Sequence, residues 1–179
     1  MTAETFARVT GHVGYMPRGI YFSELFLFLG ACVQAGVNLL IESGVKHGVS
    51  TRVLATTGLP VIAVDYGHFD VGPVDGVRFV RGDGCAEVPR LAKMHDGDRL
   101  GILIDGPKRE QGRALKDACL ALPCVRVVAC HDSPPGLGET LHSHDPQFRE
   151  TFGFLDDRIP ATALAIRPNG SGLGVWVKS

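Results

Sequence analysis

The chain has 179 residues, which is enough for one domain with a substantial core and too few for two enzyme-sized domains. Its 45% hydrophobic and 21% charged residues are ordinary for a globular protein, and a net charge of −1 without a basic stripe argues against nucleic acids and anionic membranes as partners. The longest apolar run, residues 25–29, is far shorter than the roughly 20 residues of a membrane span. The first residues lack the pattern of a signal peptide, so we expect a cytoplasmic protein.

The first part of the chain predicts a helix, a buried strand and a second helix. Residues 21–35 repeat apolar side chains at helical spacing, and Gly36 is placed to end that helix. Residues 37–41 form a short apolar run suited to a strand that is buried on both faces. Ser50 is expected to cap the next helix, which stops near Gly58.

The same alternation continues along the chain. Strands are expected at residues 61–64, 77–80, 101–104 and 125–130, and helices at residues 86–94 and 111–122. Because helices separate the strands, the connections are crossovers and the sheet should be mostly parallel, with helices on both faces. This is the doubly wound α/β class.

The C-terminal part follows a different pattern. Residues 162–167 and 173–178 are two strand-like segments joined by a Pro-Asn-Gly-Ser-Gly turn, which predicts an antiparallel hairpin. Residues 133–157, rich in Pro, Gly, His and Asp, are expected to be an irregular loop with a functional role. The whole chain, 1–179, is then one domain of seven strands, preceded by a helical segment at residues 1–36.

Five cysteines are spread along the chain without a Cys-x-x-Cys pair, which argues against a structural zinc site. Cys124 and Cys130 flank one expected strand and would lie about 20 Å apart at ~3.3 Å per residue, beyond the reach of a disulfide. We therefore expect reduced, buried thiols at Cys32, Cys85, Cys119, Cys124 and Cys130.

The turn from Glu42 to Ser50 is the sharpest functional signal, because ligands of parallel sheets bind beyond the carboxyl ends of the strands. Gly44 and Gly48 allow a tight turn and a close approach of a ligand, and the following helix N-terminus offers free N–H groups. The NAD fingerprint would require a glycine at Lys46, and the P-loop pattern is absent as well. The turn therefore predicts a polar, nucleotide-like ligand other than NAD.

Acidic residues end the neighbouring strands. Asp65 ends the second strand, where an ionised carboxylate can accept both ribose hydroxyls of an adenosine, and Tyr66 follows it. Asp83 lies between two glycines after the third strand and could reach an adenine edge, although a simple β-turn role is equally consistent. Asp105 and Asp132 follow the fourth and fifth strands.

These motifs resemble the class I S-adenosylmethionine-dependent O-methyltransferases, in particular small members of the catechol O-methyltransferase type. The resemblance runs from about residue 37 to 133. It is carried by Glu-x-Gly-x-x-x-Gly-x-Ser at Glu42 to Ser50, by Ile-Asp-Gly at residues 104–106 and by His-Asp at residues 131–132. It implies a Rossmann-like fold, with which the C-terminal hairpin agrees.

The resemblance also implies roles for individual residues. Ser50 would lie near the methionine carboxylate of S-adenosyl-L-methionine and Asp65 at the ribose. The implied cofactor-binding residues are Glu42, Ser43, Gly44, Gly48, Ser50, Asp65, Tyr66, Asp83 and Asp105. In the metal-dependent members Mg²⁺ is held at positions that match Asp105 and Asp132, and a lysine at the position of Lys108 serves as general base.

Such a centre is chemically coherent. Mg²⁺ prefers carboxylate oxygens and water, and it would lower the pKa of a substrate hydroxyl beside Lys108. The chain departs from the catechol-type enzymes at Ser133, where they usually have Asn. A second group of the family shares the Ile-Asp-Gly and His-Asp strand ends, and the chain departs from that group at Pro107-Lys108, where it generally has an acid and His. A third acidic ligand is not evident, and Asp157 and Glu139 are the candidates.

The remaining polar residues carry weaker signals. His142 and His144 form a His-x-His pair that reads as a solvated loop rather than a metal site, and His47 and His68 are interpreted in the same way. Trp176 alternates with apolar residues on the last strand and is expected to pack in the core.

Together these features predict an S-adenosylmethionine-dependent methyltransferase acting on a hydroxyl of a small molecule or sugar, with Mg²⁺ as an optional requirement. The first alternative is a Rossmann-like module that binds the cofactor without catalysis. The second is an NAD-dependent oxidoreductase, against which the glycine spacing argues. The identity of the acceptor and the formation of a homo-oligomer stay open.

Overall fold

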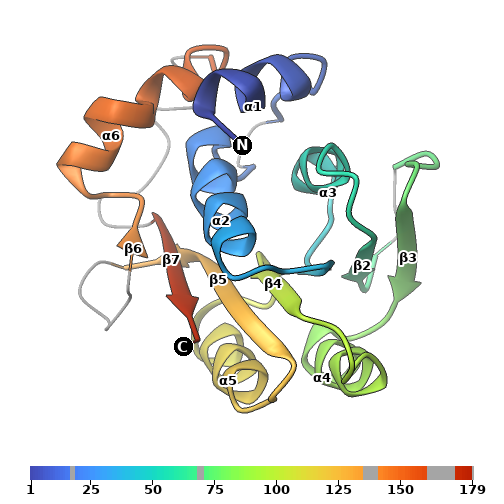
Figure 1. The fold of residues 1–179 in the computed structure, drawn as a ribbon. Coiled ribbons are helices and arrows are strands. Elements are labelled where there is room, and N and C mark those ends of the chain that lie inside the picture. The colour runs from blue at the N-terminus through green and yellow to red at the C-terminus, as the bar shows by residue number, and fades with distance from the viewer. Residues whose placement is uncertain (17–18, 68–70, 135–140, 161–171, 179) are drawn as a thin grey trace.

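A seven-stranded sheet runs through the middle of the molecule, shown in a computed structural model that describes residues 1–16, 19–67, 71–134, 141–160 and 172–178 (Figure 1). The strand order is β3-β2-β1-β4-β5-β7-β6. The strands are β1 (Leu39–Ser43), β2 (Val61–Asp65), β3 (Val77–Arg81), β4 (Leu100–Ile104), β5 (Val125–Ser133), β6 (Leu141–His142) and β7 (Gly172–Val177). Strands β1 to β5 are parallel, whereas β7 is antiparallel to both β5 and β6.

Helices cover both faces of this sheet (Figure 1). The helices are α1 (Ala3–Thr10), α2 (Phe22–Gln34), α3 (Val49–Ala55), α4 (Gly84–Met94), α5 (Arg109–Leu120), α6 (Pro146–Phe152) and the short 3₁₀ helix η1 (Gly153–Asp156). Helices α2 and α3 lie on one face with α1 beyond them, and α4 and α5 lie on the other face. None of the helices in the described ranges is both long and apolar enough to cross a membrane.

Alternating strand residues feed two separate cores. In β1, Leu40 packs with the α2 and α3 layer, whereas its neighbours Leu39 and Ile41 pack with the α4 and α5 layer. Successive strand side chains point to opposite faces, so a strand covered on both sides must be apolar throughout. This is why the short uninterrupted apolar runs of the sequence became strands.

The predicted doubly wound, Rossmann-like class is confirmed, and several element boundaries need correction. The first strand is Leu39–Ser43 rather than residues 37–41, because Gly36 turns at a φ of 65° and residues 37–38 still belong to the connection. The fifth strand continues to Ser133, since the pairing with β7 extends past Cys130. Ser50 is not the helix cap: Gly48, with a φ of 68°, precedes α3, and Ser50 lies inside the helix.

The C-terminal third also differs from expectation. Within residues 133–157, which the sequence predicts to be irregular, the chain forms β6, α6 and η1. Helix α6 is capped by Asp145 and has no fully buried side chain; only Phe148 and Phe152 of its seven residues pack, partly buried, against the core, so the apolar pattern of the helix is short. The second arm of the expected hairpin is β7; the first arm, residues 162–167, lies outside the described residues.

Candidate active site

The turn after β1 is packed directly against the end of β4. The Ser43 carbonyl accepts hydrogen bonds from the backbone N–H groups of Asp105 and Gly106 at 2.8 and 2.9 Å, and the Ser43 hydroxyl donates to the Gly106 carbonyl. Gly44 has a φ of 94°, and a Cβ there would lie 2.5 Å from the Gly106 nitrogen. Glycine is therefore required at this position by the Gly106 backbone, which packs against it and connects the turn to Asp105.

Asp65 holds the same turn from the β2 side. Its Oδ2 accepts from the backbone N–H groups of Val45 at 2.7 Å and Lys46 at 3.0 Å, and its Oδ1 accepts from Gly67 at 2.9 Å. Burial opposes ionisation of Asp65, but these backbone donors outweigh it and hold the pKa of this carboxyl below its ordinary value. A carboxylate has about four acceptor sites, so an ionised Asp65 keeps capacity for a ligand hydroxyl.

Glu42 lies buried beneath the turn. Its Oε2 accepts from the Thr51 hydroxyl at 2.5 Å, and its Oε1 has no hydrogen-bond partner among the described residues. Burial raises the pKa of Glu42 to about 7, against the opposing effect of the Ser50 and Thr51 hydroxyls. Ser50 is itself buried in α3, beside Glu42. Glu42 and Ser50 thus form a polar floor under the expected cofactor pocket.

Asp83 and Tyr66 stand at the far side of this edge. Asp83 caps α4 by accepting from the Cys85 backbone N–H at 2.9 Å, so it is a helix N-cap rather than the β-turn residue that the sequence also allowed. The Tyr66 side chain is exposed, and its hydrogen bond to Asp83 raises the pKa of the Tyr66 phenol. Both residues border the β2 and β3 strand ends, next to Asp65.

Asp105, Lys108 and Asp132 come together as the strand order predicts. The Lys108 ammonium lies 2.5 Å from Asp105 Oδ1 and 2.8 Å from Asp132 Oδ2. About two fifths of the Lys108 and Asp132 side chains is exposed, whereas Asp105 is 22% exposed. The cluster therefore opens to solvent on one side and rests on the sheet on the other.

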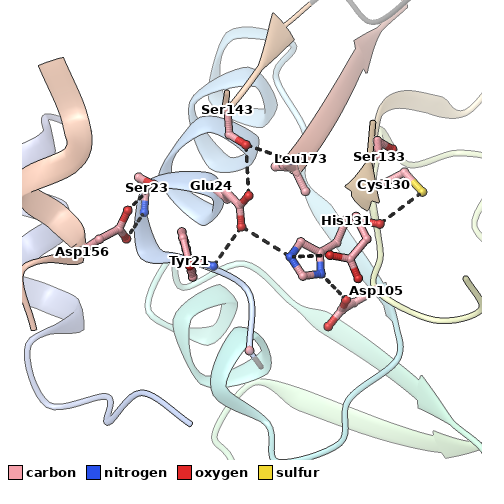
Figure 2. A network of polar contacts seen from close by, with 12 residues as sticks. Tyr21, Ser23, Glu24, Asp105, Cys130, His131, Ser133, Ser143, Asp156 and Leu173 are labelled. Atoms are coloured by element: carbon pink, nitrogen blue, oxygen red, sulfur yellow. Dashed lines mark hydrogen bonds and ion pairs between the residues drawn. The ribbon is translucent and has the colours of Figure 1, made fainter. Parts of the chain in front are cut away.

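Two further residues, His131 and Glu24, complete this cluster from the inside (Figure 2). His131 Nδ1 lies 2.6 Å from Asp105 Oδ1, and His131 Nε2 lies 3.5 Å from Glu24 Oε2. Sequence reasoning used His131 only as part of a motif and missed Glu24. Alternation along β5 places His131 on the face of Val127 and Ala129, toward α2, which is the signal that could have found the pair.

The electrostatics of the cluster favour charged groups. Burial alone would raise the pKa of Asp105, but the charges of His131 and Lys108 outweigh it and lower this pKa to about 2. In return, the carboxylates of Asp105 and Asp132 raise the pKa of Lys108, again against the effect of burial. Asp105 and Glu24 likewise raise the pKa of His131. In this arrangement Lys108 is a cation held between two anions.

The carboxylates also fit a divalent cation. One potential ligand atom each from Asp105, His131 and Asp132 lies within 4.8 Å of the others, and this is the one such group found among the described residues. Asp157 is not part of it, and Glu139 lies outside the described residues. A cation bound here would take the place that the Lys108 ammonium now occupies between the two aspartates.

The weaker sequence signals have structural explanations or remain untested. His142 and His144 stack on each other at 5.3 Å, and His142 Nε2 contacts the Ser133 carbonyl at 2.9 Å. Trp176 packs at the edge of the α4 and α5 core and carries the Lys116 ammonium 4.7 Å from its ring. Of the five free cysteines, Cys32, Cys119, Cys124 and Cys130 are buried as expected, whereas Cys85 is only half-buried. His47 is exposed, and His68 lies outside the described residues.

A polar pocket of about 150 Å³ lies beside Glu24, where α2 meets α6 and η1. It is lined by Tyr21, Ser23, Glu24, Ser143, His144, Arg149, Gly153 and Asp156. Glu24 therefore lies between this pocket and His131.

No family model and no curated protein matches the chain. Solved structures match it along nearly its whole length. Cofactor-bound Rv0187 from MTB is 20% identical with a TM-score of 0.56 and covers 98% of this chain and 88% of its own. An O-methyltransferase from Bacillus cereus in complex with SAH is 16% identical with a TM-score of 0.50, covering 98% and 90%. A protein described as a caffeoyl-CoA O-methyltransferase from Staphylococcus aureus has the same identity and TM-score, covering 100% and 93%.

The chain shares its fold with these solved structures. Asp65, Asp83, Asp105 and Asp132 lie at or just beyond the carboxyl ends of its parallel strands. At these identities the likeness establishes the fold, and the chemistry has to be argued from this chain's own residues.

Proposed function

We propose that the protein is an S-adenosylmethionine-dependent methyltransferase that methylates a hydroxyl of a small molecule. One observation carries this proposal: the glycine turn and the acidic cluster are bonded to each other through Ser43 and Gly106. A cofactor held by the turn would therefore have its reactive end next to Asp105. Binding and orientation of two reactants side by side is the main requirement of a methyl transfer.

The cofactor side of the site is formed by β1, β2 and β3. Asp65 is available to the ribose, Tyr66 and Asp83 border the adenine end, and the α3 N-terminus with Ser50 lies toward the methionine end. Gly44 and Gly48 keep the turn in its tight form. SAH and an unnamed cofactor are bound in two of the structurally similar proteins, which supports the same use of the fold here.

The reaction side is formed by Asp105, Lys108 and Asp132. When bound, S-adenosylmethionine would supply its sulfonium methyl group to the acceptor oxygen and would leave as S-adenosylhomocysteine. The hydroxyl proton passes to Lys108 Nζ, which requires the lysine to be neutral first. Since Asp105 and Asp132 stabilise its charge, Lys108 acts as a base only when those carboxylates have another partner.

Asp105 and Asp132 would hold Mg²⁺, with His131 within reach of the same point. When bound, the cation supplies positive charge that lowers the pKa of the acceptor hydroxyl. Asp105 and Asp132 would then face the cation instead of the ammonium of Lys108.

A methyl-transfer assay tests the proposal. The purified protein is given S-adenosylmethionine with a panel of catechols and sugars, with and without Mg²⁺, and S-adenosylhomocysteine release is measured. We expect acceptor-dependent release that falls roughly 10²–10⁴-fold in Lys108→Met. Lys93→Met, at an exposed lysine of α4, is the matched control and should keep full activity. Equal activity of the two variants would remove Lys108 from the mechanism.

A further inference from the structure

Glu24 is an unusual member of a helix-capping pair. It is the third residue of α2, and its Oε2 accepts from the Tyr21 backbone N–H at 2.9 Å, which is the capping-box contact. A glutamate that only caps a helix can stay at the surface. Glu24 is instead 1% exposed, and burial of a carboxylate is costly unless several partners compensate for it.

The partners of Glu24 come from distant parts of the chain (Figure 2). Its Oε1 accepts from the Ser143 hydroxyl at 3.0 Å, and Ser143 in turn accepts from the Leu173 backbone N–H of β7 at 2.8 Å. Its Oε2 faces His131 Nε2 at 3.5 Å. The carboxylate is thus fixed from three directions, by α2, by the segment after β6 and by the end of β5.

His131 is held at both ring nitrogens. Nδ1 contacts Asp105 at 2.6 Å, and Nε2 faces the buried Glu24 Oε2 at 3.5 Å and the half-exposed Asp132 Oδ1 at 3.6 Å. An imidazole with one anchor can still rotate or turn over, whereas two opposite anchors fix the plane and the direction of the ring. A fixed His131 then orients the Asp105 carboxylate from the inner side, since Asp105 Oδ1 is bound to the ring, while Lys108 binds the same oxygen from the exposed side.

We propose that Glu24 is a positioning residue of the reaction centre, acting through His131 to fix the Asp105 carboxylate. This inference rests on the proposed function for its biological meaning, whereas the chain of contacts from Glu24 through His131 to Asp105 follows from the geometry alone. Partners behind a reacting or ligating group typically change affinity or activity by 10–100-fold when removed. We expect a loss of this size in the turnover of Glu24→Ala.

Asp156 offers a matched control. It binds the first turn of the same helix, accepting from the Ser23 backbone N–H at 3.0 Å and from the Ser23 hydroxyl at 2.6 Å. It also lines the same pocket as Glu24. Asp156 interacts electrostatically with Glu24, but no contact from Asp156 to His131 or Asp105 is among those found in the described residues. Asp156→Ala therefore weakens the start of α2 and leaves the contacts of His131 with Glu24 and Asp105 in place.

The test is an NMR measurement at one fixed, neutral pH. It follows the two ring nitrogens of His131 and the side-chain carboxyl carbon of Asp105 in the full chain, with His131→Gln used for assignment. In Glu24→Ala, the Nε2 signal moves because the buried one of its two carboxylate neighbours is gone and only Asp132 is left. The proposal requires that the Nδ1 signal and the Asp105 carboxyl signal move as well, while both keep their wild-type values in Asp156→Ala.

Glu24→Gln supplies the rescue, because an amide oxygen at the same point can accept from Tyr21 and His131; its Asp105 signal should stay near the wild-type value. If Glu24→Ala does not fold, Glu24→Asp, which draws the carboxylate back by one methylene, takes its place with the same expected shifts. Unchanged Nδ1 and Asp105 signals in the folded variant would overturn the proposal, as would equal shifts in Asp156→Ala. Calorimetry with S-adenosylhomocysteine on the same samples tests the proposed function separately. The proposed function fails if neither the wild type nor any variant binds S-adenosylhomocysteine.

Discussion

Glu42 provides a quantitative test of the site's electrostatics. It is fully buried, has one oxygen without a partner, and its pKa rises from 4.5 to about 7 in the folded chain. A raised folded-state pKa means that the native state binds the proton more tightly than the unfolded state. The contribution of Glu42 to the free energy of unfolding is therefore fully present below about pH 4.5 and is lost as the pH rises through about 7.

The size of this effect follows from the two pKa values. The full change is roughly 3 kcal/mol, and most of it develops between about pH 5 and pH 8. Glu42→Gln is neutral at every pH, so it should gain roughly 2–3 kcal/mol relative to the wild type over this interval. Urea denaturation of both proteins at the two pH values measures it, with Glu110→Gln at an exposed helix position as the control. An equal pH dependence of wild type and Glu42→Gln would refute the reasoning.

Three further predictions concern packing and charge. Gly44→Ala combines a positive φ with a 2.5 Å approach to Gly106, so it should lower the unfolding free energy by about 3 kcal/mol and reduce Tm; an unchanged Tm would contradict the packing described here. Arg158 covers the Phe22 ring at 3.4 Å and donates to Thr10, so Arg158→Ala should cost roughly 2 kcal/mol in urea denaturation, and a cost near zero would show that this bridge between α1 and α2 is unimportant. Asp132→Asn should weaken Mn²⁺ binding, followed by electron paramagnetic resonance, by about 10-fold or more; equal affinity in the variant would place the cation elsewhere.

The sequence predicted the parts of the site that follow from topology. Asp105, Lys108 and Asp132 meet because the carboxyl ends of neighbouring parallel strands share one edge of the sheet, and this could be deduced once the apolar runs were recognised as strands. The same reasoning placed Asp65 beside the glycine turn.

Other parts depended on packing between segments that no local pattern connects. The Glu24–His131 contact joins the first turn of α2 to the end of β5, and a capping box gives no hint that its glutamate will be buried. The closest neighbour of Gly44 proved to be the Gly106 backbone, because loop-to-loop distances are not encoded in glycine spacing. Helix α6 was missed because it is short and only two of its side chains, Phe148 and Phe152, pack partly buried against the core.

The central claim is that the turn after β1 and Asp65 hold S-adenosylmethionine. Titration calorimetry with S-adenosylhomocysteine tests it without any knowledge of the acceptor. The account predicts saturable binding to the wild type, unchanged binding to Asp75→Asn at an exposed loop position, and about 10–100-fold weaker binding to Asp65→Asn, as expected for the loss of a charged hydrogen bond. Absence of any binding heat with the wild-type protein, or equal affinity of Asp65→Asn, would contradict it.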